Sequence, residues 1–402
     1  MRRIWVLALL INLSVFAAQD RKIEVRKPEN IQVLIEKDIK GAVLEINGPY
    51  YVFNPKDGAR ISSGILGKRF LVHAQKDGIK WGEMFPGIHQ IYITPRSPKS
   101  SILVNGIQYE GSIAVFKVKN KISIVNDISV EQYIKAVLSP LFPFPLENEV
   151  MASIAIIART NAYYHISKGH GSFWDVDAKS TGYKGSALID PKSILAKSID
   201  STKNLILIHP HQGQNVPFAA CWTEHSAGKS APYRSIFRKD GNAPEKCIKV
   251  PHAELDREET RWTTTISKVR LAELLNLSSA DKIELFIDQE SNKTCGARVT
   301  EGNRIHDYSF VEFQKMLGED KIRSSEFNVV DNNDALTFTG YGLGHGVGLC
   351  LFSATSLAQN GENAVQILSK FFPETYLMNL SAVPYQNSNV VDNRNEIIFF
   401  NH

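Results

Sequence analysis

Short apolar runs separated by turn signals dominate the chain from residue 30 to residue 127. Examples are the runs at 31–35, 42–46 and 113–118, and Asn47-Gly48 and Asn105-Gly106 are two of the turns. Runs of β-branched and other apolar residues bounded by such turns are typical of antiparallel strands. The pattern therefore predicts an N-terminal antiparallel β region over residues 30–127, with strand spacing too irregular to name a barrel or a sandwich.

Helical signals begin after residue 128. Pro145 opens an apolar run at 146–165 that carries Glu147 and Glu149 in its first turn and Arg159 near its end. This order of charges suits the helix dipole, and the apolar middle indicates a buried helix. Further helices are expected at 310–317 and 354–371, and further strands at 204–208, 261–266 and 282–287. We predict an α+β fold, rich in strands, with one long buried helix, a second region at 128–378 and a tail at 379–402.

The first seventeen residues have the features of a secretory signal. Arg2 and Arg3 precede an apolar run at 4–16, and Val15 and Ala17 stand at the −3 and −1 positions of a cleavage site. The run is short for a membrane-spanning helix. We therefore expect an exported protein of the periplasm or cell envelope, in which the segment is either removed or kept as an N-terminal anchor.

Composition narrows the function classes only slightly. The 402 residues include 46 Lys and Arg against 42 Asp and Glu, and 43% are hydrophobic, which excludes collagen-like, coiled-coil and wholly disordered chains. No basic stripe is interleaved with aromatic residues, so we expect no nucleic-acid partner.

The four cysteines have no metal-binding spacing. Cys221, Cys247, Cys295 and Cys350 lie too far apart for a C-x-x-C pattern. In an exported protein they form one or two disulfides or remain buried free thiols, and both alternatives stay open. We expect neither a structural metal nor a cofactor.

Four segments in order carry motif residues that together resemble a known family. They are the block from Val125-Asn126 through Glu131, Tyr133, Ala136-Val137 and Pro143 to Ala158-Arg159-Thr160; the block Ser226-Ala227-Gly228-Lys229-Ser230; the block Cys295-Gly296-Ala297-Arg298-Val299 with Leu317-Gly318 and Ser324-Ser325-Glu326-Phe327; and the block Gly342-Leu343-Gly344-His345-Gly346-Val347-Gly348 with Phe372-Pro373 and Thr375. They resemble the stage II sporulation protein D (SpoIID) family over roughly residues 30–378.

The resemblance implies peptidoglycan lytic transglycosylation, with the long helix lining a glycan-binding cleft. Such enzymes cleave the bond between N-acetylmuramic acid and N-acetylglucosamine, and one carboxylic acid protonates the leaving oxygen. The same group then accepts the proton of the muramic 6-hydroxyl as the 1,6-anhydro ring closes. This acid needs a desolvated position that raises its pKa, and a second carboxylate is unnecessary because the nucleophile belongs to the substrate.

The chain departs from the family at this acid. Aligning Tyr133 and Pro143 with the family pattern places Leu141 at the position of the catalytic Glu. Leucine cannot transfer a proton, so either the chain is inactive, the register is shifted, or another acid serves. The candidate replacements are Glu147 and Glu149, which are otherwise acids that stabilise a helix start.

Glu224 is a third candidate acid because it precedes the Ser226 block, although such a residue is more often an ordinary loop carboxylate.

Three further positions are candidates for substrate binding within the last block. His345 lies between Gly344 and Gly346, which allow the backbone to approach a sugar while the imidazole binds a hydroxyl group. The alternative is a turn histidine bonded to the backbone.

Three polar side chains outside that block are also candidates. Arg159 either forms a buried pair or binds a lactyl or acetamido oxygen. Lys229 is a loop cation with a weaker claim to substrate contact. Tyr183 lies in a Tyr-x-Gly element, which some relatives place after a Cys/His zinc cluster; residues 177–185 contain neither Cys nor His. No metal is therefore carried over.

Our leading hypothesis is an exported protein that cleaves glycan strands in septal or envelope remodelling. The resemblance implies a preference for strands already stripped of stem peptides. The alternative is a catalytically inactive relative that binds glycan and recruits or activates other wall enzymes, such as amidase or divisome partners. The alternative draws its main support from Leu141.

Overall fold

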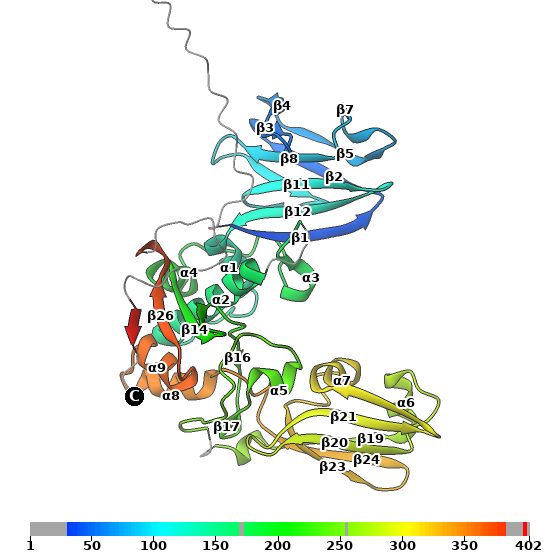
Figure 1. The fold of residues 1–402 in the computed structure, drawn as a ribbon, viewed down its shortest axis with the longest axis vertical. Coiled ribbons are helices and arrows are strands. Elements are labelled where there is room, and N and C mark those ends of the chain that lie inside the picture. The colour runs from blue at the N-terminus through cyan, green and yellow to red at the C-terminus, as the bar shows by residue number, and fades with distance from the viewer. Residues whose placement is uncertain (1–29, 169–172, 254–255, 383–396, 400–402) are drawn as a thin grey trace, which may run out of the picture.

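The computed structural model describes residues 30–168, 173–253, 256–382 and 397–399 (Figure 1). The predicted signal segment and most of the predicted tail lie outside these residues. Strand accounts for 41% of the described residues and helix for 25%, which confirms the strand-rich α+β class. Among the described residues, no helix is both long enough and apolar enough to cross a membrane.

The N-terminal part forms two sheets. One contains seven strands in the order β13 (Val176–Asp177), β1 (Asn30–Ile39), β12 (Lys121–Ser129), β11 (Ser112–Val118), β8 (Gln90–Pro95), β3 (Tyr50–Phe53) and β4 (Arg60–Gly64). The other contains six strands in the order β10 (Ile107–Tyr109), β9 (Ser101–Val104), β2 (Gly41–Asn47), β5 (Lys68–Gln75), β6 (Gly78–Trp81) and β7 (Glu83–Pro86). All pairings are antiparallel except that of β1 with β13.

Alternation of apolar residues explains how the two sheets share one core. In β2, Ala42, Leu44 and Ile46 are buried while the residues between them are partly exposed. Trp81 of β6 is fully buried and its indole N–H donates to the Leu44 carbonyl oxygen at 3.0 Å. The same hydrophobic cluster continues into the helices that follow.

Six helices and a small sheet form the middle of the molecule. The helices are α1 (Val130–Leu138), α2 (Asn148–Lys168), α3 (Ala178–Thr181), α4 (Ile194–Ser201), α8 (Leu351–Gln359) and α9 (Ala364–Phe371). The sheet contains β15 (Gln214–Val216), β14 (Leu205–His211), β26 (Tyr376–Asn379) and β27 (Ile397–Phe399) in that order, and a short 3₁₀ helix (Leu380–Ala382) follows β26.

The long buried helix is confirmed as α2, and one helix prediction is wrong. Residues 354–371 do not form one helix, because the chain turns between α8 and α9 at Gly361, which has φ +89°. Asn363 then caps α9 and forms a reciprocal capping box with Gln366.

A second, smaller core lies in the segment between residues 231 and 347 (Figure 1). Its elements are α5 (Tyr233–Phe237), a 3₁₀ helix (Glu258–Thr260), β19 (Trp262–Ser267), α6 (Lys268–Leu275), β20 (Lys282–Asp288), β21 (Lys293–Glu301), β22 (Arg304–Ser309), α7 (Phe310–Leu317), β23 (Glu326–Asp331) and β24 (Ala335–Tyr341). The strands form two three-stranded sheets, β19-β24-β23 and β20-β21-β22. We call this segment the small domain.

Two short strand pairs connect the small domain to the rest of the chain. The chain leaves through β16 (Trp222–Thr223) and returns through β25 (Leu349–Cys350), and these strands pair in parallel. Beside them β17 (Lys229–Ser230) pairs with β18 (Ile248–Lys249). The crossing point therefore brings the second and fourth motif blocks together.

Candidate functional site

Backbone and hydroxyl hydrogen bonds hold the last glycine block against β16. The Thr223 hydroxyl donates to the Leu343 carbonyl oxygen at 3.0 Å and accepts from the Gly346 N–H at 3.1 Å. His225 exchanges backbone hydrogen bonds with Leu343 in both directions. One buried threonine therefore fixes both sides of the turn that carries His345.

Glycine is required at alternate positions of this segment, which we call the glycine loop (residues 342–348). Gly342, Gly344, Gly346 and Gly348 all have positive φ, between +72° and +91°. A Cβ on Gly344 would lie 2.6 Å from the Thr223 hydroxyl, and one on Gly348 would lie 2.1 Å from the Cys221 carbonyl oxygen. The close approach that we predicted for a sugar is thus made to the protein's own backbone and side chains.

His345 is partly buried, and its ring nitrogens face the protein. Its Nδ1 accepts from the Val347 N–H at 3.1 Å, and the Phe237 ring packs edge-on at a centroid distance of 5.1 Å. Burial lowers the pKa of His345 to about 4, although a hydrogen bond with the Trp222 backbone acts in the opposite direction. The imidazole is therefore neutral at physiological pH, in the geometry of the turn-histidine alternative.

The turn after α1 brings the position of the missing acid to β16. The Phe142 ring lies 6.0 Å from the Trp222 ring, so residue 141 is adjacent to the crossing point. Leu141 and Phe144 are 57% and 82% exposed, respectively. We call Leu141, Phe142, Phe144 and Trp222 the apolar surface. Its chemistry is aromatic and aliphatic.

The two acids at the start of α2 contact other helices. A Glu149 carboxylate oxygen accepts from the Ala364 N–H, the first of α9, at 2.7 Å. Glu147 accepts from the Gln359 amide of α8 at 3.2 Å. Glu149 thus accepts from a helix N–H that has no partner within α9. These contacts support the helix-stabilising alternative for both residues.

Glu224 and Lys229 lie near the site and differ in their partners. Glu224 is exposed beside Thr223, and the described residues offer no hydrogen bond to its carboxylate. Lys229 is also exposed, and its ammonium donates to the Glu290 carbonyl oxygen at 2.9 Å. Of the three candidate acids, Glu224 is the one placed at the crossing point.

Arg159 occupies the buried-pair role that the sequence left open. Its guanidinium is fully buried, and Nε and Nη2 donate to the two carboxylate oxygens of Glu131 at 2.8 and 2.7 Å. Further N–H groups donate to the carbonyl oxygens of Ile199 and Leu205. With these donors used inside the protein, Arg159 has no face for a glycan.

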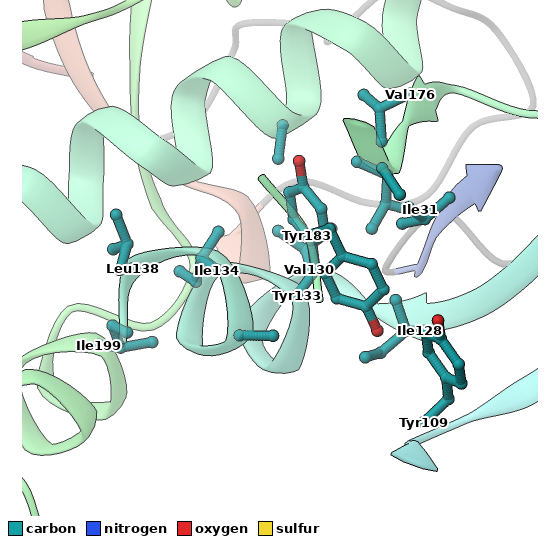
Figure 2. Packing of buried hydrophobic residues seen from close by; sticks show 14 of the residues in the cluster. Ile31, Tyr109, Ile128, Val130, Tyr133, Ile134, Leu138, Val176, Tyr183 and Ile199 are labelled. Atoms are coloured by element: carbon teal, nitrogen blue, oxygen red, sulfur yellow. The ribbon is translucent and has the colours of Figure 1, made fainter. Parts of the chain in front are cut away.

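Tyr183 is likewise buried, and it lies away from the glycine loop. Its hydroxyl donates to the Asn126 side-chain oxygen at 2.5 Å, and burial raises its pKa. Figure 2 shows its ring packed with Tyr133 and Tyr109, at centroid distances of 5.7 and 6.0 Å. Tyr183 therefore belongs to the core between the sheets and α1.

A buried charged network behind the site was not predicted. The Lys293 ammonium donates to the Ser226 carbonyl oxygen at 2.6 Å and to Glu326 at 2.5 Å, and Glu326 also pairs with Arg257 at 2.6 Å. Burial lowers the pKa of Lys293, while Glu326 acts in the opposite direction. Both carboxylate oxygens of Glu326 are thus engaged by cations. Its partners lie 33 and 69 residues away, so no local signal identifies the network.

Neither the thiols nor the small pocket beside Cys221 adds a ligand site. All four cysteines are free thiols, and burial raises the pKa of Cys221 to about 12. Within the described ranges, no group of three or more His, Cys, Asp or Glu side chains could hold a metal ion. A pocket of about 30 Å³ behind Cys221, Tyr233 and Val347 has room for little more than one water molecule.

Comparison with known proteins connects the chain to a family. Residues 118–209 match the family model described as stage II sporulation protein (SpoIID). This stretch contains Leu141, Glu149, Arg159 and Tyr183, whereas the glycine loop lies beyond it.

Three curated relatives are uncharacterized bacterial proteins. A Chlamydia pneumoniae protein is 32% identical over 197 residues, covering 48% of this chain and 70% of the relative. A Chlamydia muridarum protein is 34% identical over 182 residues, covering 45% of this chain and 63% of the relative. A Brachyspira hyodysenteriae protein is 25% identical over 348 residues, covering 83% and 89%.

Proposed function

Because the chain belongs to the SpoIID family, which relates it to the cell wall, we propose that it binds peptidoglycan glycan strands at the apolar surface and holds them without cleaving them. The observation that carries this proposal is Leu141, an exposed aliphatic side chain at the position of the family's acid. The protein acts after export, on strands stripped of stem peptides.

The chemistry of the apolar surface suits a sugar ring. Aromatic side chains offer flat faces on which the C–H groups of a pyranose pack, and Trp222 and Phe142 supply two such faces. Phe144 extends the surface into solvent. A glycan held there gains apolar burial without a proton donor, as expected of a binding site.

The missing proton donor is the argument against cleavage. Lytic transglycosylation needs a carboxylic acid with a raised pKa beside the glycosidic oxygen. Glu149 and Glu147 are engaged with α9 and α8, and both carboxylate oxygens of Glu326 are engaged by Lys293 and Arg257. A strand that is bound and uncleaved would present the wall to other enzymes, such as amidase or divisome partners.

One observation favours a second candidate function. Glu224 is exposed at the crossing point, and its carboxylate has no hydrogen-bond partner among the described residues. If Glu224 serves as the acid, the chain is a lytic transglycosylase with a relocated proton donor. Its exposure counts against this role, because the acid of a lytic transglycosylase needs a desolvated position.

The two functions differ in their products. The protein is incubated with peptide-free glycan strands, and the soluble products are examined by mass spectrometry while bound protein is measured by sedimentation. We expect no 1,6-anhydro products, and we expect Phe144→Ser to weaken binding about tenfold. Leu188→Ser, which changes another exposed apolar side chain, is the matched control.

Anhydro products from the unaltered chain would overturn the binding-only proposal. Glu224→Gln, Glu147→Gln and Glu149→Gln then identify the acid, because the correct variant loses the products and keeps sedimentation. Leu141→Glu is the converse test. If the rest of the site is intact, this variant gains anhydro products that the unaltered chain does not make.

A further inference from the structure

Large apolar side chains are exposed at one end of the paired N-terminal sheets, away from the candidate site. Ile65 and Leu66 are 79% and 82% exposed in the turn between β4 and β5, and Phe70 and Leu71 of β5 are 53% and 54% exposed. We call residues 64–71 the apolar tip. Figure 1 shows β4 and β5 toward one extreme of the long axis, far from β16 and β17.

The tip is a protrusion, which distinguishes it from a groove for a peptide. The turn joins an edge strand of the seven-stranded sheet to a strand of the six-stranded sheet. Gly64 and Gly67 flank Ile65 and Leu66, so these two side chains form its apex. Adjacent apolar side chains at such an apex can enter an apolar phase without moving the strands behind them.

Positive charge surrounds this end of the sheets. Strand register places Pro95 beside Tyr50 and Tyr50 beside Gly64, so Arg96 follows the end of β8 at the same edge as the tip. Lys99 lies in the turn that follows β8. The next residue, Ser100, packs against Gly48, and its hydroxyl donates to the Pro49 carbonyl oxygen.

The acidic side chains nearby are already paired. Glu83 pairs with Lys68, and Glu45 pairs with Arg69 at 3.1 Å. Arg96 instead packs over the Tyr51 ring at 5.3 Å. Neither Arg96 nor Lys99 forms an ion pair with any described residue. The edge of the tip therefore carries net positive charge.

From this combination we propose that the apolar tip inserts Ile65 and Leu66 into an anionic lipid surface, with Arg96 and Lys99 at the headgroups. Apolar side chains at an apex with cations behind them match the order of layers in a membrane, in which hydrocarbon lies below anionic headgroups. A protein partner would need a complementary apolar pocket and would gain nothing from the cations unless it were acidic. The tip would tether the protein, and the candidate site lies well away from it along the long axis (Figure 1).

The experiment measures binding of the full chain to vesicles of phosphatidylcholine with phosphatidylglycerol, and to vesicles of phosphatidylcholine alone. The apolar run at 4–16 is present in every variant, so its contribution is common to all. We expect Ile65→Ser/Leu66→Ser to weaken binding at least tenfold. Arg96→Gln and Lys99→Gln each weaken binding to the anionic vesicles about fivefold and leave binding to the neutral vesicles unchanged.

Ile305→Ser/Val330→Ser is the matched control, because these residues are 60% and 58% exposed on the small domain. Amide hydrogen exchange gives a local readout, and it should slow in residues 64–71 when anionic vesicles are added. All the substituted side chains are exposed or partly exposed, and a thermal melt confirms that each variant is folded.

Two results would overturn the proposal. One is unchanged vesicle binding by Ile65→Ser/Leu66→Ser together with unchanged exchange at 64–71. The other is a dimer of the full chain without lipid that this double variant converts to monomer, which would assign the tip to a second copy of the chain. Phe144→Ser should not affect vesicle binding, so this test stands apart from the glycan proposal.

Discussion

The turn after α1 and the glycine loop meet at β16, and they differ in how tightly the structure determines them. The glycine loop has four glycines at positive φ packed against Thr223, Cys221 and His225. The turn after α1 instead leaves Leu141 and Phe144 largely in solvent. Substitution in the loop changes the backbone, whereas substitution in the turn changes only the surface chemistry.

This difference indicates which of the two segments tolerates a change of side chain. The loop keeps its glycines because Cβ atoms at Gly344 and Gly348 would collide with protein atoms, whatever the site binds. At the turn, Leu141 is largely exposed, so we expect a change of its side chain to have little effect on folding. Retained motif glycines are therefore evidence for the fold, while the residue at position 141 is evidence for the chemistry.

The largest expected effect is that of Gly348→Ala on stability. A Cβ there would lie 2.1 Å from the Cys221 carbonyl oxygen, and the backbone has φ +75°. We expect a loss of about 3–4 kcal/mol in the free energy of unfolding, measured by urea denaturation.

Gly361→Ala is the control for the backbone contribution, because φ is +89° there and no atom lies within 4 Å of the added Cβ. We expect it to lose about 1 kcal/mol. Equal losses in the two variants would show that the glycine loop is not tightly packed.

The second effect is a pH dependence that originates at His345. Its pKa is about 4 in the folded protein and near 6.5 in an unfolded chain. Below pH 6.5 the unfolded chain therefore binds a proton that the folded chain does not, and stability falls until about pH 4. Between pH 7 and pH 4 we expect the free energy of unfolding to fall by about 2 kcal/mol more in the unaltered protein than in His345→Gln. Thermal denaturation at each pH measures this difference. Parallel pH curves for the two proteins would contradict this.

The third effect concerns Glu149 as the cap of α9. We expect Glu149→Ala to lower the free energy of unfolding by about 1 kcal/mol, because the Ala364 N–H loses its acceptor. Glu149→Gln should recover part of this, since an amide oxygen still accepts. Glu147→Ala is the control, with a loss below about 0.5 kcal/mol because its contact with Gln359 is exposed. If Glu147→Ala is the more damaging variant, the capping role is misassigned.

The smallest effect on stability is expected at the turn itself. Leu141→Ser should change the free energy of unfolding by less than about 0.5 kcal/mol, because the side chain is 57% exposed. Glycan sedimentation should nevertheless decrease. A large loss of stability would mean that Leu141 is a structural residue, and the comparison between turn and loop would fail.

Local patterns predicted the elements of the fold well. The apolar run and its terminal charges predicted α2, and Ser309 with Glu312 forms a capping box at the start of α7, where a helix was expected. The division between α8 and α9 could have been predicted too. Gly361 followed by Asn363 and Gln366 is a helix stop and a capping-box start.

The site was harder to predict, because its partners are distant in sequence. Arg159 is paired with Glu131, 28 residues away, and Glu149 caps a helix that begins 215 residues later. The sequence alone does not distinguish an arginine that forms a buried ion pair from one that binds substrate, because the partner that decides the role is distant along the chain. Leu141 is the exception, because a leucine side chain cannot transfer a proton whatever surrounds it in the fold.

The pairing of β16 with β25 also constrains the order in which the molecule folds. Trp222 pairs with Leu349 across 127 residues, so two residues of strand must compensate the entropy of a very long closed loop. The small domain has its own hydrophobic core, and once it folds it holds the two ends of that loop near each other. Refolding should therefore proceed through a state in which the small domain is formed and the glycine loop has not yet docked.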